Sequence, residues 1–366
     1  MWGKQEIAEI LGEDDANVFA YCYGVESEGN AEHDPHGEFV GKNILYAAHS
    51  VKEAAEHFQK SLADIESVLR RSQKKLLDRR AKRPRPHLDD KILTDWNGLV
   101  ISSLAFGSRV LGDSKYLEAA ENAARFILKN LTRKDGRLLH RFRDGEADIL
   151  GTIDDYAFFI HGLIDLYEAS FNIEYLKEAK RLCHEMVRLF WDEKEGGFFF
   201  TASDAEGLIL RKKEAYDGAT PSGNSVAALS LIRLGRLFSD ADLEKKSRRI
   251  FEVFSGEMMQ RESAYTQMLM ALDFALGPSK EIVIASDGKD SKIAPMIKIL
   301  YEKFVPNKVV IFRPASRKEK EDIIRLIPFV KEQAAMDGKP TAYVCENHVC
   351  RMPTGDLEKF RELLKN

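Results

Sequence analysis

Three long segments in the middle of the chain are apolar around most of their circumference, and an amphipathic segment follows each one. The first spans residues 94–111, carries its apolar residues at a helical period, and is followed by Gly112, where glycine commonly ends a helix. Residues 152–170 and 220–238 repeat this pattern. A helix that is apolar all round is buried, and an amphipathic helix can cover it. The pattern therefore predicts pairs of inner and outer helices.

The helix pairs recur at intervals of roughly 60–70 residues, as in proteins built from stacked repeats. The segments predicted as outer helices are 114–131, 172–191 and 242–256, and residues 263–276 begin a further unit. Residues 133–151 and 193–213 separate the units and have the glycine-containing turn signals of β-hairpins. Stacked pairs that curve on themselves form a toroid, so we expect a mainly α fold, a partial (α/α)6 toroid of inner–outer helix hairpins.

The pattern changes after Pro278. Three short runs rich in β-branched residues, at 281–285, 308–312 and 341–345, are separated by segments long enough for a crossover helix. This predicts a small C-terminal parallel α/β unit over 278–366. No glycine-rich phosphate loop accompanies these runs. The expected domains are then a helical lead-in over 1–80, the toroid portion over 81–277, and this unit.

Composition excludes some classes of protein. The 366 residues carry a net charge of −4, which disfavours a dedicated nucleic-acid binder, and no apolar run reaches the length of a membrane span. The N-terminus lacks the features of a secretory signal, and four cysteines are too few for a disulfide framework. We therefore expect a cytoplasmic protein that binds neither nucleic acid nor membranes.

Cysteine and histidine come together near the C-terminus. Cys345, His348 and Cys350 are zinc-type ligands, but their spacing is not C-x-x-C and no fourth ligand is evident. Buried thiols are the favoured interpretation, while a disulfide and a metal site stay open. No metal site and no cofactor are predicted.

The three inner helices start alike. Thr94, Thr152 and Thr220 are N-cap candidates, so helix capping explains part of the polar sequence there. Capping does not explain all of these polar residues. Parallel inner helices bring their N-termini to one end of the toroid, which we call the mouth, and both hairpins lead into it. Carboxylates, amides and aromatic rings in one basin suit a sugar, whose hydroxyls and ring faces they can bind. The predicted acid or base candidates are Asp89, Asp90, Asp95, Asp154 and Asp155. The predicted ligand contacts are His87, Lys91, Trp96, Asn97, His140, Arg141, Tyr156, Tyr216, Asp217, Ser222 and Asn224.

Four segments resemble one known family. These are "RPHLDDKILTDWNGLVISSLA", "DDYAFFIHGLIDLYEA", "ATPSGNSVAALSLIRL" and "YVCENHVCRMP". In order, they are similar to the C-terminal half of the YyaL-type proteins, also called spermatogenesis-associated thioredoxin-domain proteins. The resemblance implies a toroid like those of N-acylglucosamine 2-epimerases and six-hairpin glycosidases, hence a role in carbohydrate metabolism.

The chain also departs from that family. Its cysteines form no C-x-x-C, and we expect the thioredoxin domain and the first hairpins of the toroid to be missing. We therefore expect a C-terminal fragment with open apolar edges that needs a partner carrying the missing half or forms a homo-oligomer. The predicted function is binding or processing of a carbohydrate-like ligand at the mouth, with isolated enzymatic activity doubtful. The alternative is a non-catalytic scaffold or interaction domain of a redox-linked protein.

Overall fold

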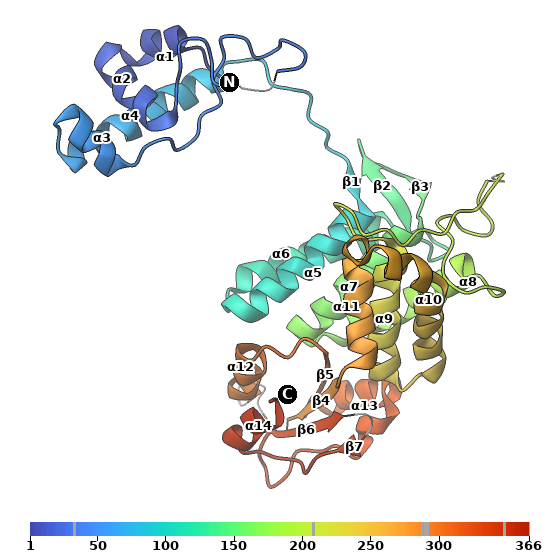
Figure 1. The fold of residues 1–366 in the computed structure, drawn as a ribbon. Helices are drawn as coiled ribbons and strands as arrows, with labels where there is room; N and C mark the ends of the chain where they lie inside the picture. Colours follow the sequence, from blue (N-terminus) through green and yellow to red (C-terminus); the bar gives the residue numbers. More distant parts are fainter. Residues whose placement is uncertain (32–33, 207–208, 287, 289–292, 347–348, 366) are drawn as a thin grey trace. The chain divides into compact units, whose positions relative to one another are not determined.

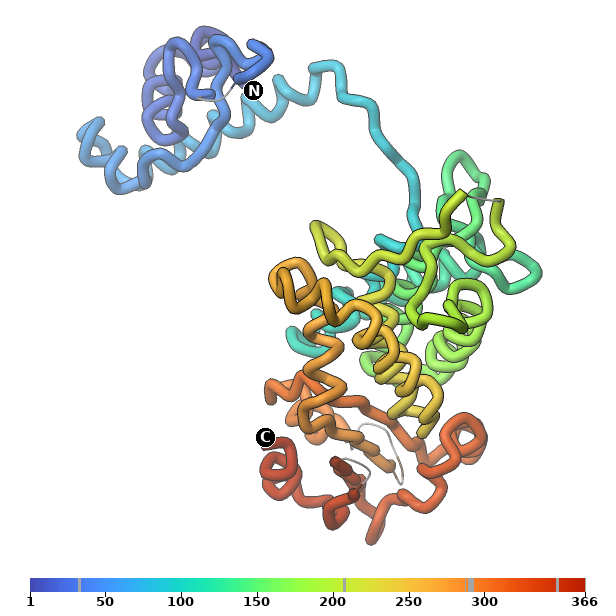
Figure 2. Tube along the Cα trace, turned by 45° about the vertical axis from the view of Figure 1, so that its right-hand side comes forward, coloured from blue at the N-terminus to red at the C-terminus, as the bar shows by residue number. Residues whose placement is uncertain are grey.

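The computed structural model describes residues 1–31, 34–206, 209–286, 288, 293–346 and 349–365, and its chain divides into two compact units (Figures 1 and 2). The first unit is Met1–Asp89 and the second is Asp90–Asn366. The first unit thus extends nine residues past the expected limit at residue 80. The expected toroid portion and α/β unit belong together to the second unit. None of the described helices has the length and apolarity needed to cross a membrane.

The N-terminal unit is a small helical bundle around its own apolar core. Its helices are α1 (Lys4–Leu11), α2 (Glu13–Tyr23), α3 (Val51–Phe58) and α4 (Leu62–Ala81). The charged segment from residue 51 forms two helices, because Gln59 adopts a left-handed conformation and Ser61 caps a new helix. Ile7, Phe19 and Ile65 are among the buried residues that hold the bundle together.

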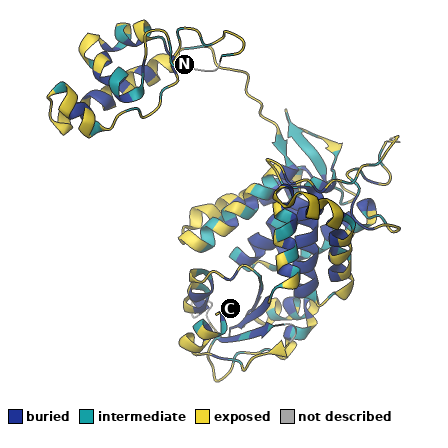
Figure 3. Cartoon of the chain, in the orientation of Figure 1, coloured by how far each residue is buried: buried dark blue, intermediate teal, exposed yellow. Residues whose placement is uncertain are grey.

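The second unit contains the predicted helix pairs, side by side. Its inner helices are α5 (Thr94–Leu111), α7 (Ile153–Ser170), α9 (Gly223–Phe238) and α11 (Thr266–Leu276). Its outer helices are α6 (Ser114–Asn130), α8 (Ile173–Phe190) and α10 (Ala241–Gln260). The inner helices pack on one another in the order α5, α7, α9 and α11, and the first three also pack on their own outer helices. Helices α7 and α9 are buried along almost their whole length (Figure 3). The mainly α fold with stacked inner–outer hairpins is confirmed.

Glycine sets the spacing of the first two inner helices. A Cβ atom at Gly98 of α5 would lie 2.5 Å from the backbone carbon of Phe158, and one at Gly162 of α7 would lie 2.5 Å from the Gly98 oxygen. The two backbones therefore touch, and any side chain at either position would force the helices apart. This close packing holds the N-termini of α5 and α7 together.

One face of α5 is open to solvent, unlike the buried helices α7 and α9 (Figure 3). Trp96, Val100, Phe106 and Val110 recur at helical spacing, and each exposes at least half of its surface. This apolar face is where the open edge expected from the sequence could lie, and that expectation stays a prediction. We call these four residues the α5 stripe.

Two β-elements lead the chain into the inner helices. Strands β1 (Ile92–Leu93), β2 (Leu139–Arg143) and β3 (Glu146–Leu150) form an antiparallel sheet, which contains the first predicted hairpin. In the described part of 193–213 no strand pair forms, contrary to the second hairpin prediction. That segment is a loop held by the Trp191–Phe198 bridge and by a hydrogen bond from the Phe200 N–H to the Lys212 carbonyl.

The C-terminal part of the second unit carries a four-stranded sheet in the order β5–β4–β6–β7. Its strands are β4 (Lys280–Ala285), β5 (Lys308–Arg313), β6 (Thr341–Glu346) and β7 (Val349–Cys350), and its helices are α12 (Ala294–Glu302), α13 (Arg317–Leu326) and α14 (Leu357–Leu363). Strands β4 and β5 are parallel, as predicted, whereas β6 is antiparallel to β4. The prediction of an entirely parallel sheet was therefore wrong. Ala285, the last residue of β4, pairs with Arg313 at the end of β5 and with Thr341 at the start of β6. The chain therefore leaves β5 and enters β6 at the same end of the strands, so α13 is not part of a crossover connection.

Cys345 and Cys350 form a disulfide across β6 and β7. The favoured interpretation of buried free thiols was therefore wrong for this pair, and the disulfide occupies both sulfur atoms that a metal would need. Cys22 and Cys183 are the buried free thiols. His348 lies outside the described residues.

Candidate functional site

Asp155 joins the N-termini of two inner helices. Its carboxylate accepts hydrogen bonds from the Thr152 N–H (2.7 Å), which completes a capping box on α7, and from the Asp95 N–H (3.1 Å) at the start of α5. His140 on β2 lies 2.9 Å from the same carboxylate through Nδ1. Asp155 is fully buried, so these donors offset the cost of removing its charge from water.

Asp217 joins the N-termini of the next two inner helices, α9 and α11. It accepts from the Ser222 N–H (2.9 Å) before α9 and from the Gln267 (2.9 Å) and Met268 (3.1 Å) N–H groups at the start of α11. Unpaired N–H groups at a helix N-terminus attract anions, which explains a buried aspartate at this place. The N-termini of inner helices are thus gathered at one end of the helical layer, as the mouth prediction requires.

Asp154 lies between α7 and α9. Its carboxylate accepts a hydrogen bond from the Gly223 N–H, and a Cβ at Gly223 would lie 2.8 Å from Cγ2 of Ile153 and would also clash with the Asp154 carboxylate. Burial, followed by the charges of Asp155 and Asp95, raises the pKa of Asp154 to about 7. A carboxyl group with this pKa exchanges protons near neutral pH, as a general acid or base must.

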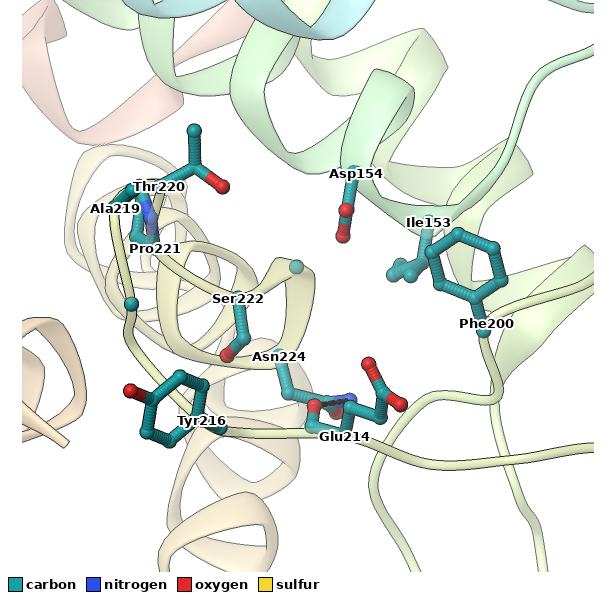
Figure 4. Close-up of a pocket in the computed structure, with 12 residues that line it drawn as sticks. Ile153, Asp154, Phe200, Glu214, Tyr216, Ala219, Thr220, Pro221, Ser222 and Asn224 are labelled. Carbon is teal, nitrogen blue, oxygen red and sulfur yellow. Dashed lines mark hydrogen bonds between the residues drawn. The ribbon is translucent and has the colours of Figure 1, made fainter. Parts of the chain in front are cut away.

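A cavity of about 270 Å³ opens beside this carboxylate. The carboxylates of Asp154 and Glu214 face the same space from opposite sides, with Tyr216 at one edge and Phe200 at another (Figure 4). The full set of lining residues is Ile153, Asp154, Phe200, Glu214, Tyr216, Gly218, Ala219, Thr220, Pro221, Ser222, Gly223 and Asn224. Two carboxylates, a hydroxyl and an aromatic ring around one small space can hold a polar ligand with a flat apolar face.

Asp95, His140 and Asp155 form the only group of possible metal ligands found among the described residues, with one ligand atom from each within 4.8 Å of the others. We interpret the group as a hydrogen-bonded cluster, because both oxygens of Asp155 already accept from backbone, hydroxyl or imidazole donors. The hydrogen bond to Asp155 raises the pKa of His140, and burial next to Asp155 raises that of Asp95. An imidazole held by a buried carboxylate in this way is oriented for proton transfer.

Several predicted ligand contacts have structural partners. The Tyr156 hydroxyl accepts from the Leu138 N–H at 3.0 Å, and the Asn97 amide donates to the Leu93 carbonyl at 2.8 Å. Ser222 is the N-cap of α9. Asn224 is buried and bonds both the N–H and the carbonyl of Phe198. These side chains therefore shape the mouth, and of them only Ser222 and Asn224 also line the cavity.

The other predicted residues lie around this arrangement. His87 and Asp89 are exposed and belong to the N-terminal unit, so they are not part of the site that the second unit forms. Lys91 is exposed just before β1. Asp90 pairs with Arg143 at 2.9 Å, and Arg141 lies 3.8 Å from Asp148. Trp96 belongs to the α5 stripe.

Sequence reasoning missed Glu214 and Gly223. Glu214 lies in a loop without a helical or strand period, nine residues before the start of α9, so no spacing rule placed it near Asp154. The sequence did contain a signal for Gly223. Glycine lowers the stability of a helix, so its presence in the first turn indicates that another group approaches closely there. Here the approaching groups are Asp154 and Ile153.

No protein-family model matches the chain. Spermatogenesis-associated protein 20 of Homo sapiens is 33% identical over 387 residues, which cover 100% of this chain and 49% of the human protein. The protein of that name from Mus musculus is 31% identical over 387 residues, with coverages of 100% and 48%. The chain is homologous to about half of spermatogenesis-associated protein 20. The resemblance to that family, which rested on four sequence segments, is confirmed, and the chain spans about half the length of these relatives.

Among solved structures, cellobiose 2-epimerase from Bacillus thermoamylovorans is similar with 16% identity and a TM-score of 0.41, covering 76% of each chain. An unsaturated glucuronyl hydrolase specific for heparin has 15% identity and a TM-score of 0.39, covering 56% of this chain and 59% of that one.

Proposed function

We propose that this homologue of spermatogenesis-associated protein 20 binds a carbohydrate-like ligand in the cavity beside Asp154 and processes it by acid–base chemistry. The observation that carries the proposal is the Asp154 carboxyl group, which lines a cavity at the inner-helix N-termini and has a pKa of about 7. Near neutral pH such a group can donate a proton to a sugar oxygen or remove one from a carbon next to a carbonyl. Glu214, across the cavity, is the second group for such a reaction.

The apolar part of the cavity supports a sugar over a purely polar ligand. Tyr216 is exposed and presents its ring to solvent at the cavity edge, and Phe200 and Pro221 add further apolar surface. A sugar ring has one face rich in C–H groups and a rim of hydroxyls. The aromatic rings would cover the C–H face of the sugar. Asp154, Glu214 and Ser222 would form hydrogen bonds with its hydroxyl groups.

The experiment is a thermal-shift screen of the full chain against a panel of neutral, acidic and amino sugars, repeated with Asp154→Asn. A sugar that binds the native state raises its melting temperature by mass action. We expect stabilisation by at least one sugar in the wild-type chain and its loss in Asp154→Asn. The matched control is Asp144→Asn, because Asp144 lies in the exposed β2–β3 turn and has the left-handed conformation that asparagine also adopts.

The outcomes separate two functions. Sugar-dependent stabilisation that Asp144→Asn retains and Asp154→Asn loses supports the proposal, and incubation of that sugar followed by mass spectrometry and NMR identifies any product. An absence of stabilisation across the panel contradicts it. The result would then favour the alternative of a non-catalytic scaffold, which is consistent with the exposed α5 stripe.

A further inference from the structure

The charged residues among those described as lining the cavity are all acidic. Asp154 and Glu214 bring two carboxylates to its wall, and none of the described residues that line it is a lysine, arginine or histidine. A ligand with a carboxylate or phosphate would meet like charges there without a compensating cation. Such a juxtaposition costs binding free energy rather than supplying it.

Two acidic residues just outside the cavity add to this imbalance. The charges of Asp155 and Asp95 act on Asp154 and make its environment more negative. Lys213 is directed elsewhere, to Asp192 at 2.8 Å and Glu195 at 3.1 Å. Lys212 forms an ion pair with Glu214, but both side chains are substantially exposed. Water therefore screens this ion pair, and a ligand can replace Lys212 as the partner of Glu214.

The size of the cavity limits the ligand. A volume of about 270 Å³ lies just below the range of roughly 300–1,000 Å³ that is usual for small-molecule sites. The space suits one sugar ring rather than an oligosaccharide. The exposed Tyr216 ring at its edge can stack on that sugar and can also attract a nearby cation through its π face.

Resting on the proposed function, we propose that the cavity selects amino sugars, whose protonated amine would lie between the carboxylates of Asp154 and Glu214 while the sugar ring stacks on Tyr216. An ammonium group has three N–H donors and no acceptor, so it complements two carboxylates that face each other. Neutral sugars would bind less tightly because their hydroxyl groups carry no positive charge to pair with the two carboxylates. Sugars that carry a carboxylate would bind least.

The test uses four probes of similar size on the full chain at pH 7 and low ionic strength. Glucosamine carries the amine, N-acetylglucosamine keeps the nitrogen without its charge, glucose has a hydroxyl in its place, and glucuronate carries a negative charge. Isothermal titration or ligand-observed NMR gives the four dissociation constants. We expect glucosamine to bind about tenfold or more tightly than N-acetylglucosamine and glucose, which corresponds to about one ion pair in a partly solvated site. We expect glucuronate to bind more weakly than glucose.

Two variants test the role of the carboxylates. Glu214→Gln lies on an exposed loop segment and keeps the size of the side chain, so folding is not expected to depend on it. We expect it to reduce the preference for glucosamine over glucose to a few-fold, and Asp154→Asn to do the same. Asp144→Asn, the exposed control, keeps the preference. Raising the salt concentration also lowers the preference, since screening weakens the ion pair.

The failure of this inference differs from the failure of the proposed function. If glucose and N-acetylglucosamine bind as tightly as glucosamine and all three lose affinity in Asp154→Asn, the sugar site stands and selection for the amine is wrong. Tight binding of glucuronate overturns the selection as well. If none of the four probes binds, both proposals fail. A glucosamine preference that persists in both Glu214→Gln and Asp154→Asn places the amine elsewhere and also overturns the inference.

Discussion

The Asp154 carboxylate and the Gly223 N–H hydrogen-bond each other across the junction of α7 and α9, and only glycine at position 223 leaves room for that contact. We expect Gly223→Ala to destabilise the chain by about 1–3 kcal/mol, because the new methyl group would force Ile153 and Asp154 to move. Urea unfolding followed by circular dichroism measures the change.

The matched control for that substitution is Gly256→Ala. Gly256 lies within α10 and has no atom within 4 Å of the position that its Cβ would take. Alanine there should stabilise the chain by about 0.5–1 kcal/mol, through its higher helix propensity. Equal effects of the two substitutions would contradict the close contact at Gly223.

The raised pKa of Asp154 predicts a pH-dependent effect of Asp154→Asn. In the unfolded chain the group titrates near 3.8 and in the folded chain near 7, so the folded state binds more protons between these values. The wild-type chain therefore loses stability as pH rises through this window, whereas the asparagine variant does not. We expect the variant to gain about 1–3 kcal/mol relative to the wild type between pH 4.5 and pH 8.

Unfolding free energies of both chains across that pH range are the measurement. The control is again Asp144→Asn, which removes a carboxylate from an exposed side chain. A constant difference for Asp154→Asn would mean that the Asp154 carboxyl titrates at its ordinary value. General acid–base chemistry near neutral pH would then lose its main support.

The helical layer could be predicted from the sequence because its signal is local. Residues 152–170 are apolar on nearly every side, and the structure buries almost all of α7. The direction of β6 could not be predicted, because a strand shows the same two-residue alternation in either direction. The segment from α13 to β6 re-enters the sheet at the end of the strands where β5 left it, and periodicity carries no information about such a return.

The candidate site could also be predicted only in part from the sequence. Helix starts placed Asp95, Asp154 and Asp155 at one end of the layer, and Asp155 joins the starts of α5 and α7 in the structure. Capping and site chemistry use the same residue types, so sequence alone could not separate Asp154, which lines a cavity, from Asp217, whose oxygens serve as helix caps. That separation depends on distances between segments far apart along the chain.

Asp155 should be among the least replaceable side chains of the mouth. Its two oxygens accept hydrogen bonds from the Asp95 N–H, from the Thr152 N–H and hydroxyl, and from His140. Asparagine has only one acceptor oxygen, and its NH₂ group would face some of these donors. We expect Asp155→Asn to cost about 2–4 kcal/mol in the free energy of unfolding.

The comparison is Asp113→Asn. Asp113 is the N-cap of α6 and accepts one hydrogen bond, from the Lys115 N–H, which asparagine accepts as well. Its cost should stay within a few tenths of a kcal/mol. Similar small costs for both variants in urea unfolding would contradict the role of Asp155 in joining α5 and α7.

The disulfide between Cys345 and Cys350 predicts a labelling pattern. In denaturant without reductant, alkylation should modify only Cys22 and Cys183, and with reductant all four cysteines. Under native conditions these two buried thiols should react slowly, because burial raises the pKa of each and the thiolate is the reactive form. Intact-mass spectrometry counts the adducts, and four adducts without reductant would contradict the disulfide.

The α5 stripe predicts association of the chain through this helix. Trp96, Val100, Phe106 and Val110 expose apolar side chains on one face of α5, and a second copy could cover them by packing helix on helix. We expect the chain to form a concentration-dependent dimer in analytical ultracentrifugation and Phe106→Ser with Val110→Ser to weaken it by tenfold or more, because burial of two large apolar side chains contributes about 1.5–3 kcal/mol each. Leu77→Ser, at an equally exposed leucine of α4, is the control and should leave the dimer unchanged. A monomer at every concentration, or equal loss of the dimer in all variants, would show that α5 does not mediate self-association.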